Sequence, residues 1–162
     1  MGVSTVAFLA VSQDDPLAQP LLDELALEYA QRYDGDRDRI HRWLRSYPAA
    51  EFSPPAGALL VGVLDGRPVT GGAFRRFDAT TAELKRIWTD SAHRRRGYAR
   101  LLLAELEALI AARGYRRVYL TTGDRQPEAE RLYQTTGYRR LAEPLPAAGD
   151  ENYPVAFLKE LP

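Results

Sequence analysis

The sequence contains no cysteine, only two histidines and one methionine, and it carries no net charge. Without cysteine the chain can form neither disulfide bonds nor thiolate metal sites, and it cannot hold an acyl group on sulfur. The two histidines, His41 and His93, do not suffice for a histidine-rich metal centre, so we expect no bound metal. Basic and acidic side chains each total 22, which disfavours nucleic-acid or membrane binding by bulk electrostatics.

Long hydrophobic runs are also missing. No segment is long enough to span a membrane, and the N-terminus lacks the charged and apolar regions of a signal peptide. The 162 residues, 45% hydrophobic and 27% charged, are typical of one globular domain covering residues 1–162. We therefore expect a soluble, cytoplasmic protein with neither a membrane nor a nucleic-acid partner.

Hydropathy patterning predicts a mixed α/β fold of the α+β class with a mostly antiparallel central sheet. The pair Asp65-Gly66 between two apolar runs is typical of a β-hairpin, and a third strand follows in a meander. A helix then joins two strands that can run parallel. Residues 48–55 are predicted to be an irregular connector. The predicted order is β-α-α-β-β-β-α-β-α-β-β, with strands at 5–11, on both sides of the turn within 57–77, and at 82–89, 116–122, 138–142 and 153–160, and helices at 16–33, 40–47, 97–112 and 127–137.

Three arginines, Arg94, Arg95 and Arg96, stand directly before Gly97 at the start of a predicted helix. The first backbone N–H groups of a helix have no internal partner, and the helix dipole adds positive charge there. Gly97 lets an anion approach the backbone closely, and Ala99 is small enough to do the same. Arginine adds forked donors suited to phosphate, so a pyrophosphate matches this segment. The alternative is an ordinary solvated loop.

Other phosphate-binding and hydrolytic motifs are absent from the sequence. It contains no G-x-x-x-x-G-K-[ST] for a nucleoside triphosphate and no G-x-G-x-x-G for a dinucleotide. It also lacks G-x-S-x-G and H-E-x-x-H. The sequence therefore gives no support for a nucleoside triphosphate, a dinucleotide or a hydrolytic reaction at this predicted anion site.

Two motifs together resemble the GNAT superfamily of acyl-CoA-dependent N-acyltransferases. The run Arg94-Arg95-Arg96-Gly97-Tyr98-Ala99 fits the pattern [QR]-x-x-G-x-[GA] at a helix start. The segment AERLYQTTGY, residues 129–138, fits the pattern A-x-x-L-Y-x-x-x-G-[FY]. The resemblance spans Glu83 to Tyr138, and the predicted element order is similar to that of the family fold.

The resemblance implies that acetyl-CoA is the acyl donor. Its pyrophosphate would rest on the backbone N–H groups of Arg95, Arg96, Gly97, Tyr98 and Ala99, with Arg94 and its neighbours adding side-chain charge. The pantetheine arm would run along strand 82–89, where this strand and the next splay apart, and bond to the backbone of the stretch Ile87-Trp88-Thr89. Many relatives carry an asparagine that contacts the arm seven residues before the tyrosine, where this chain has Gln126.

Glu83 is the candidate general base. An alkylammonium must lose its proton before it attacks a thioester, which costs about 4–5 kcal/mol at pH 7. A carboxylate near the thioester, directly or through water, would accept that proton. The alternative is a structural carboxylate paired with Lys85 or an arginine. Simple alternation places Glu83, Lys85, Ile87 and Thr89 on one face of the strand, unless a bulge breaks the parity.

Tyr133 is the candidate general acid. A phenol with its pKa near 10 can donate to the leaving thiolate without ionising first. The alternative is a core tyrosine on the inner face of a short helix. Backbone N–H groups of Ile87 or Thr89 are the candidate donors to the oxyanion.

The acceptor side is less defined. Under the resemblance, His41 and Trp43 would roof the acceptor pocket, whereas a packed tryptophan with a surface histidine is the simpler interpretation. The acidic loop 149–151 and Tyr153 could border the pocket and suit a cationic amine, or they could form a solvated loop. The pairs predicted to face water are Arg75-Arg76 and Arg139-Arg140.

The function that the resemblance implies is N-acetyl transfer from acetyl-CoA to a primary amine, by direct attack in a ternary complex. The acceptor could be a small-molecule amine or a protein amine, and a homodimer is compatible with the sequence. A different class remains open, in which the chain is a catalytically inactive acyl-CoA-binding or sensor module.

Overall fold

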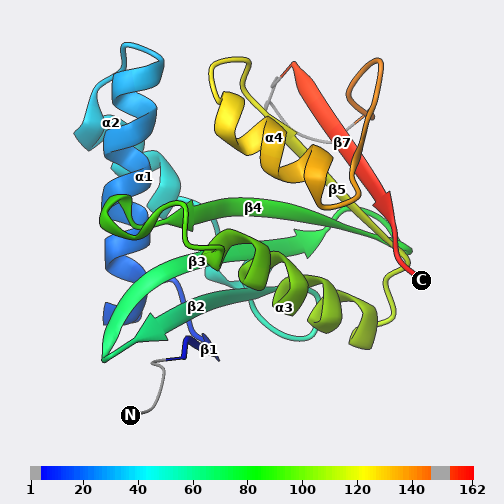
Figure 1. Ribbon diagram of the computed structural model, residues 1–162, viewed down its shortest axis with the longest axis horizontal. Coiled ribbons are helices and arrows are strands. Elements are labelled where there is room, and N and C mark those ends of the chain that lie inside the picture. The colour runs from blue at the N-terminus through cyan, green and yellow to red at the C-terminus, as the bar shows by residue number, and fades with distance from the viewer. Residues whose placement is uncertain (1–4, 147–153) are drawn as a thin grey trace.

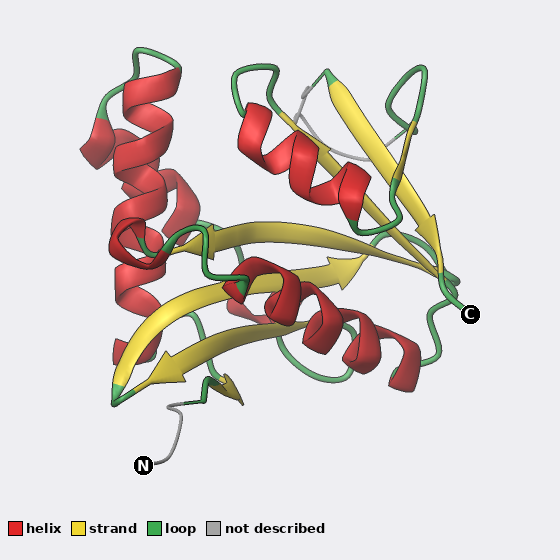
Figure 2. Ribbon diagram, in the orientation of Figure 1, coloured by secondary structure: helices red, strands yellow, loops and turns green. Residues whose placement is uncertain are grey.

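The computed structural model describes residues 5–146 and 154–162. Its strands are β1 (Ala7–Ala10), β2 (Ala58–Leu64), β3 (Arg67–Arg76), β4 (Thr81–Thr89), β5 (Arg117–Thr122), β6 (Arg139–Arg140) and β7 (Val155–Glu160). Its α-helices are α1 (Gln19–Arg32), α2 (Arg37–Arg45), α3 (Tyr98–Ala112) and α4 (Pro127–Thr135). Figure 2 shows these helices packed around a single twisted sheet. The predicted order of elements is therefore confirmed.

The strands form one sheet in the order β1-β2-β3-β4-β5-β7-β6. Strands β4 and β5 pair in parallel, joined by the crossover helix α3, and every other pair within the described residues is antiparallel. The prediction of a mixed, mostly antiparallel sheet with an early meander is confirmed (Figure 1).

Helices cover both faces of the sheet. On one face, α3 buries a leucine-rich stripe, including Leu102 and Leu106, against β2, β3 and β4. On the other face, α1 packs Leu21 and Leu25 against Trp88 of β4. Both stripes follow helical spacing, because only one side of each helix meets the sheet. Within the part of the chain that the structure describes, no helix is both long and apolar enough to cross a bilayer.

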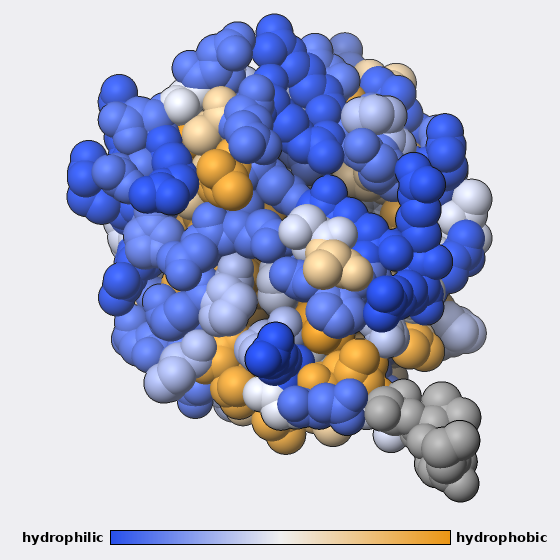
Figure 3. All heavy atoms as spheres, turned by 60° about the vertical axis from the view of Figure 1, so that its left-hand side comes forward, coloured by the Kyte–Doolittle hydropathy of each residue, from blue (hydrophilic) through white to orange (hydrophobic). Residues whose placement is uncertain are grey.

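The outer surface over α1 and α2 is mostly hydrophilic. Apolar side chains on the face seen in Figure 3 gather in small separate groups. The large apolar residues that stay exposed include Leu27 and Trp43. This face offers no argument for a dimer, so the homodimer stays a prediction.

The predicted starts of two helices and the predicted irregular connector need correction. The helix predicted at 16–33 begins as a 3₁₀ turn, Pro16–Ala18, and becomes α-helical only at Gln19. Pro20 has no N–H to donate, so it fits the first turn of a helix and not its interior. Helix α2 begins at Arg37 instead of residue 40, because the Asp36 carboxylate caps it by accepting bonds from two backbone amides. The connector contains a further 3₁₀ turn, Ala49–Phe52.

A bulge in β4 and the divergence of β4 from β5 create the space for a site. Trp88 lies opposite Gly71 and Lys85 lies opposite Ala73, so two residues of β4 occupy the place facing Gly72. One of them, Arg86, has φ +60°, a conformation that L-residues rarely adopt. Simple alternation along β4 is therefore wrong, and the bulge alternative is confirmed.

The pairing of β4 with β5 ends early. It covers only Thr81 to Glu83 on β4 and Arg117 to Tyr119 on β5. Beyond these residues the two strands diverge, as Figure 1 shows. The splayed strands that the family resemblance implies are present in this chain.

Candidate active site

A cavity of about 690 Å³ lies where β4 and β5 separate. One wall is β4 from Leu84 to Thr89, and the opposite wall is the end of β5 with the inner face of α4. The ends of α1 and α2 close one side, and the turn that leads into α3 forms the other end. The cavity therefore follows the bulged half of β4 from the start of α3 to the aromatic side chains near α2.

The start of α3 presents unpaired backbone amides to this cavity. Gly97 is the residue before the helix, with φ +82° and no side-chain cap. A Cβ atom built on Gly97 would meet nothing within 4 Å, so the space beside it is open. Gly97, Tyr98 and Ala99 all line the cavity. These features fit the predicted cradle for a pyrophosphate, with the helix beginning at Tyr98 instead of Gly97.

The three arginines before Gly97 differ in where their side chains lie. Arg94 donates from Nε to the Thr89 carbonyl at 3.4 Å and forms an ion pair with Glu28 of α1. Its side-chain charge is thus paired with α1, while Arg94 also lines the cavity, so its contact with phosphate stays a prediction. Arg95 lines the cavity, whereas Arg96 is exposed outside its lining.

The predicted pantetheine-binding stretch Ile87-Trp88-Thr89 also lines the cavity. The Trp88 side chain is buried in the core under α1, so only its backbone is placed to serve a ligand. Its carbonyl accepts a bond of 2.8 Å from the Thr70 hydroxyl. Gln126 lies across the cavity from β4, and its amide is 3.5 Å from the Tyr33 hydroxyl.

Tyr133 projects from α4 into the cavity wall and is only 5% exposed. Its ring packs against Tyr138 at 5.6 Å and Phe157 at 5.7 Å between centroids. Tyr133 is therefore both a core residue and part of the cavity wall. Burial raises the pKa of Tyr133, which keeps the phenol protonated and able to donate. No described residue hydrogen-bonds its hydroxyl.

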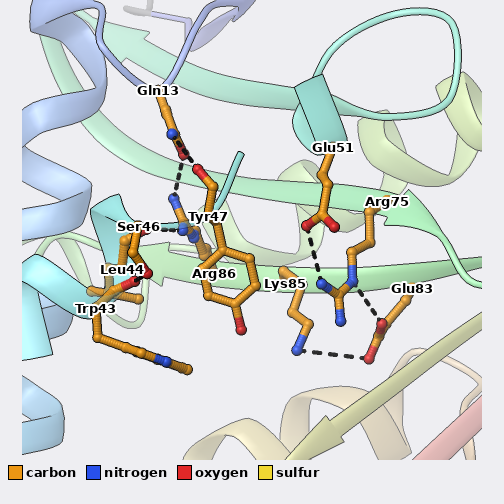
Figure 4. Close-up of polar contacts among 10 residues, drawn as sticks. All are labelled: Gln13, Trp43, Leu44, Ser46, Tyr47, Glu51, Arg75, Glu83, Lys85 and Arg86. Carbon is orange, nitrogen blue, oxygen red and sulfur yellow. Dashed lines mark hydrogen bonds and ion pairs between the residues drawn. The ribbon is translucent and has the colours of Figure 1, made fainter. Parts of the chain in front are cut away.

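Glu83 is buried behind the cavity wall and does not line it. Its carboxylate accepts a bond from Arg75 Nε at 3.0 Å and lies 3.7 Å from the Lys85 ammonium. Figure 4 shows Arg75 between the carboxylates of Glu51 and Glu83. The structural ion pair is thus present, and Glu83 reaches the cavity only through Lys85, which lines it. The prediction that Arg75 faces water is wrong, because these two carboxylates hold it.

Residues 18–138 match the acetyltransferase (GNAT) family. The chain belongs to this family. It is 30% identical over 92 residues to an uncharacterized N-acetyltransferase, YsnE, of Bacillus subtilis, which covers 56% of this chain and 60% of that protein. The chain spans 36–60% of the length of the curated relatives that it matches.

Solved structures share the fold of this GNAT chain. PaiA N-acetyltransferase from Thermoplasma acidophilum, in complex with coenzyme A, has a TM-score of 0.75 at 15% identity, covering 97% of this chain and 99% of that one. A GNAT family acetyltransferase from Elizabethkingia anophelis with acetyl-CoA bound has a TM-score of 0.66 at 16% identity, covering 97% and 99%. At these identities the likeness establishes the fold alone.

The sequence did not single out several residues of the cavity whose pKa values are shifted, Lys85 and Tyr29 among them. Burial lowers the pKa of Lys85 to about 8, with the neighbouring Glu83 carboxylate opposing the shift. Burial raises the pKa of Tyr29 to about 12, and the nearby Tyr133 adds to the shift. The sequence contains one sign of the role of Lys85, which is its position two residues after the candidate base Glu83. Tyr29 gave none, since its helical spacing is that of a core residue.

The acceptor-side predictions have mixed outcomes in this GNAT chain. Trp43 of α2 lines the cavity, whereas His41 lies outside the lining, with its Nε2 atom 2.9 Å from a carboxylate oxygen of Asp23. His93 lines the cavity and is bonded through Nδ1 to Asp90 at 2.6 Å. The loop 149–151 and Tyr153 lie outside the described residues.

Contacts between α1 and the loop before α4 close one side of the cavity. Arg32 donates to the Arg125 carbonyl at 2.9 Å and pairs with Glu128 at 3.0 Å. Arg125 returns a bond of 2.9 Å to the Arg32 carbonyl. The sequence offered no sign of this contact, because its partners are more than 90 residues apart.

Proposed function

We propose that this chain transfers an acetyl group from acetyl-CoA to a primary amine by direct attack in a ternary complex. The observation that carries the proposal is one continuous cavity whose wall includes the open helix start at Gly97 and the buried hydroxyl-bearing Tyr133. A pyrophosphate at Gly97 and a thioester beside Tyr133 would both lie along the bulged half of β4. Membership of the GNAT family supports the same reaction class.

The proposed reaction forms one bond and breaks another. The neutral amine attacks the thioester carbon, the C–N bond forms, and the C–S bond breaks as the tetrahedral intermediate collapses. Backbone N–H groups of β4 near Ile87 or Thr89 would stabilise the oxyanion. Tyr133 would donate its proton or a hydrogen bond to the leaving CoA thiolate.

The proton of the acceptor ammonium would leave through Lys85 and Glu83. A lysine whose pKa is about 8 is partly neutral near pH 8, so it can accept a proton from an amine beside it. The Glu83 carboxylate, 3.7 Å away, would then stabilise the ammonium formed on Lys85. In this scheme the predicted base Glu83 acts behind Lys85 and not in contact with the acceptor.

An assay of thiol release from acetyl-CoA with a panel of primary amines tests the proposed function. We expect thiol release that depends on an amine, together with binding of CoA measured by calorimetry. Binding of CoA with no thiol release for any amine would instead support the inactive sensor module. Absence of CoA binding by well-folded protein would overturn both functions.

Glu83→Gln should change the pH dependence of turnover. In the wild type we expect kcat/KM to rise with pH through about 8, as Lys85 loses its proton. Because the Glu83 carboxylate raises the pKa of Lys85, its removal should move this rise to lower pH. The plateau should fall by about tenfold, since the ammonium on Lys85 loses the stabilising charge of the Glu83 carboxylate.

The profile of Glu83→Gln should be measured with the same acceptor as the wild type, so that titration of the acceptor is common to both. Glu105→Gln, an exposed carboxylate on α3, is the matched control and should leave the profile unchanged. A Glu83→Gln profile identical to that of the wild type would remove Glu83 from the proton route.

A further inference from the structure

The bulge in β4 turns two consecutive cations toward the cavity. Lys85 and Arg86 both line it, and Arg86 is only 7% exposed. Arg86 holds φ +60°, a backbone conformation that persists only when the surroundings enforce it. A buried arginine is costly unless its charge is compensated, so the partners of Arg86 decide what it can bind.

The recorded partners of Arg86 are all uncharged. Its guanidinium donates to Gln13 Oε1 at 3.2 Å and to the Leu44 carbonyl. It also lies over the Tyr47 ring at 5.2 Å, as Figure 4 shows. The Phe52 ring lies 4.7 Å from the same guanidinium. Among the described residues no carboxylate lies within 4 Å of it. The structure thus holds the guanidinium in place without neutralising its charge.

The nearby acids are already engaged with other cations. Glu51 bonds Arg75 at 3.2 Å, and Glu83 bonds both Arg75 and Lys85. Burial lowers the pKa of Arg86 to about 10, which the more distant Glu51 and Tyr29 oppose and Arg75 reinforces. Arg86 therefore stays protonated at neutral pH.

The remaining acids of the cavity lining lie elsewhere and are also paired. Among the described residues only Glu28 and Glu128 contribute carboxylates to the lining. Glu28 pairs with Arg94, and Glu128 pairs with Arg32. None is left to bind a second amino group of a polyamine.

Aromatic rings surround Arg86. We call the part of the cavity lined by Tyr29, Trp43, Tyr47 and Phe52 the aromatic end. Trp43 is 39% exposed and meets Tyr47 edge to face at 5.5 Å. Large apolar surface beside an uncompensated cation is suited to a ligand that carries both an apolar group and an anion.

We propose that the acceptor is a small primary amine that carries a carboxylate and an apolar or aromatic side chain, with Arg86 binding the carboxylate. The inference rests on the proposed acetyl transfer and deepens it by naming the acceptor class. The forked donors of arginine match a carboxylate in geometry as well as in charge. The aromatic end takes the apolar side chain, and the amine is left toward Lys85 and the thioester.

Three acceptors of similar shape test the inference with the wild-type chain. Phenylalanine carries the carboxylate, phenylalaninamide replaces it with a neutral polar group, and phenethylamine lacks it. We expect kcat/KM for phenylalanine to exceed that for the other two by about 100-fold or more, because an unfilled buried cation penalises them. Spermidine and a lysine-containing peptide should be poorer still.

Arg86→Gln tests the residue. It should raise KM for phenylalanine by about tenfold or more and leave KM for phenylalaninamide and the Kd for CoA unchanged. Arg76→Gln, an exposed arginine on the neighbouring strand, is the control and should change none of these. Circular dichroism and thermal melting would verify that each variant folds. The comparison of the three acceptors uses the wild-type chain and so does not depend on any variant.

The outcomes separate the two proposals. Equal turnover of phenylalanine and phenylalaninamide, or preference for spermidine, would overturn the inference while the acetyl transfer stands. An Arg86→Gln variant that keeps the carboxylate preference would also overturn it. CoA binding without thiol release from any amine would overturn the proposed function and the inference with it.

Discussion

Tyr133→Phe is expected to lower kcat by about 100- to 1,000-fold while it changes the Kd for CoA by less than about twofold. The substitution removes one oxygen atom and retains the ring that packs against Tyr138 and Phe157. The thiolate would then leave without a donor, and a positioned acid contributes a factor of this size. The pKa of Tyr133, raised by burial, keeps the donor protonated across the assay range.

Steady-state thiol release measures kcat, and calorimetry measures CoA binding separately. The control is Tyr138→Phe, since the Tyr138 hydroxyl lies outside the cavity lining and bonds Glu107 at 2.9 Å. This control should reduce thermal stability and leave kcat nearly unchanged. Equal losses of turnover and CoA affinity in Tyr133→Phe would show that the tyrosine is structural.

Gly97→Asp is expected to weaken CoA binding by about 100-fold. Gly97 adopts φ +82°, which aspartate tolerates better than most residues, and the space for its Cβ is open. The new carboxylate would therefore stand at the helix start without unfolding α3. There it would repel the pyrophosphate and occupy the positive end of the helix dipole.

Gly97→Asn is the matched control, because asparagine has the same size and the same backbone tolerance without the charge. We expect the asparagine variant to bind CoA within about fivefold of the wild type. The difference between the two variants should shrink as salt is added, since exposed charges are screened. If both variants lost affinity equally, the loss would come from the backbone or from volume, and the electrostatic cradle would be refuted.

Much of the fold follows from short-range patterns in the sequence. The turn at Asp65-Gly66 and the start of α3 next to Gly97 depend on residues within one or two turns of each other. The start of α1 at Gln19 also follows from a local feature, since Pro20 fits only the first turn of a helix. Short motifs also place Gly97 and Tyr133, and both line the same cavity.

The rest of the site depends on contacts between segments that are distant in the chain. The register of β4 against β3 places the bulge at Arg86, and the residues next to Arg86 in the sequence do not predict it. The same register puts Glu83 behind Lys85, so the residue predicted as the base is one side chain away from the cavity.

Local propensity and motif spacing were thus enough for the order of elements, the place of Gly97 before α3 and the place of Tyr133 on α4. Only the folded sheet decided which β4 side chains enter the cavity, because a strand has two faces and one extra residue exchanges them. The sheet register also gives Arg86 uncharged partners. Its neighbours Gln13 and Leu44 come from segments more than 40 residues away, so the sequence near Arg86 does not reveal that its charge is uncompensated.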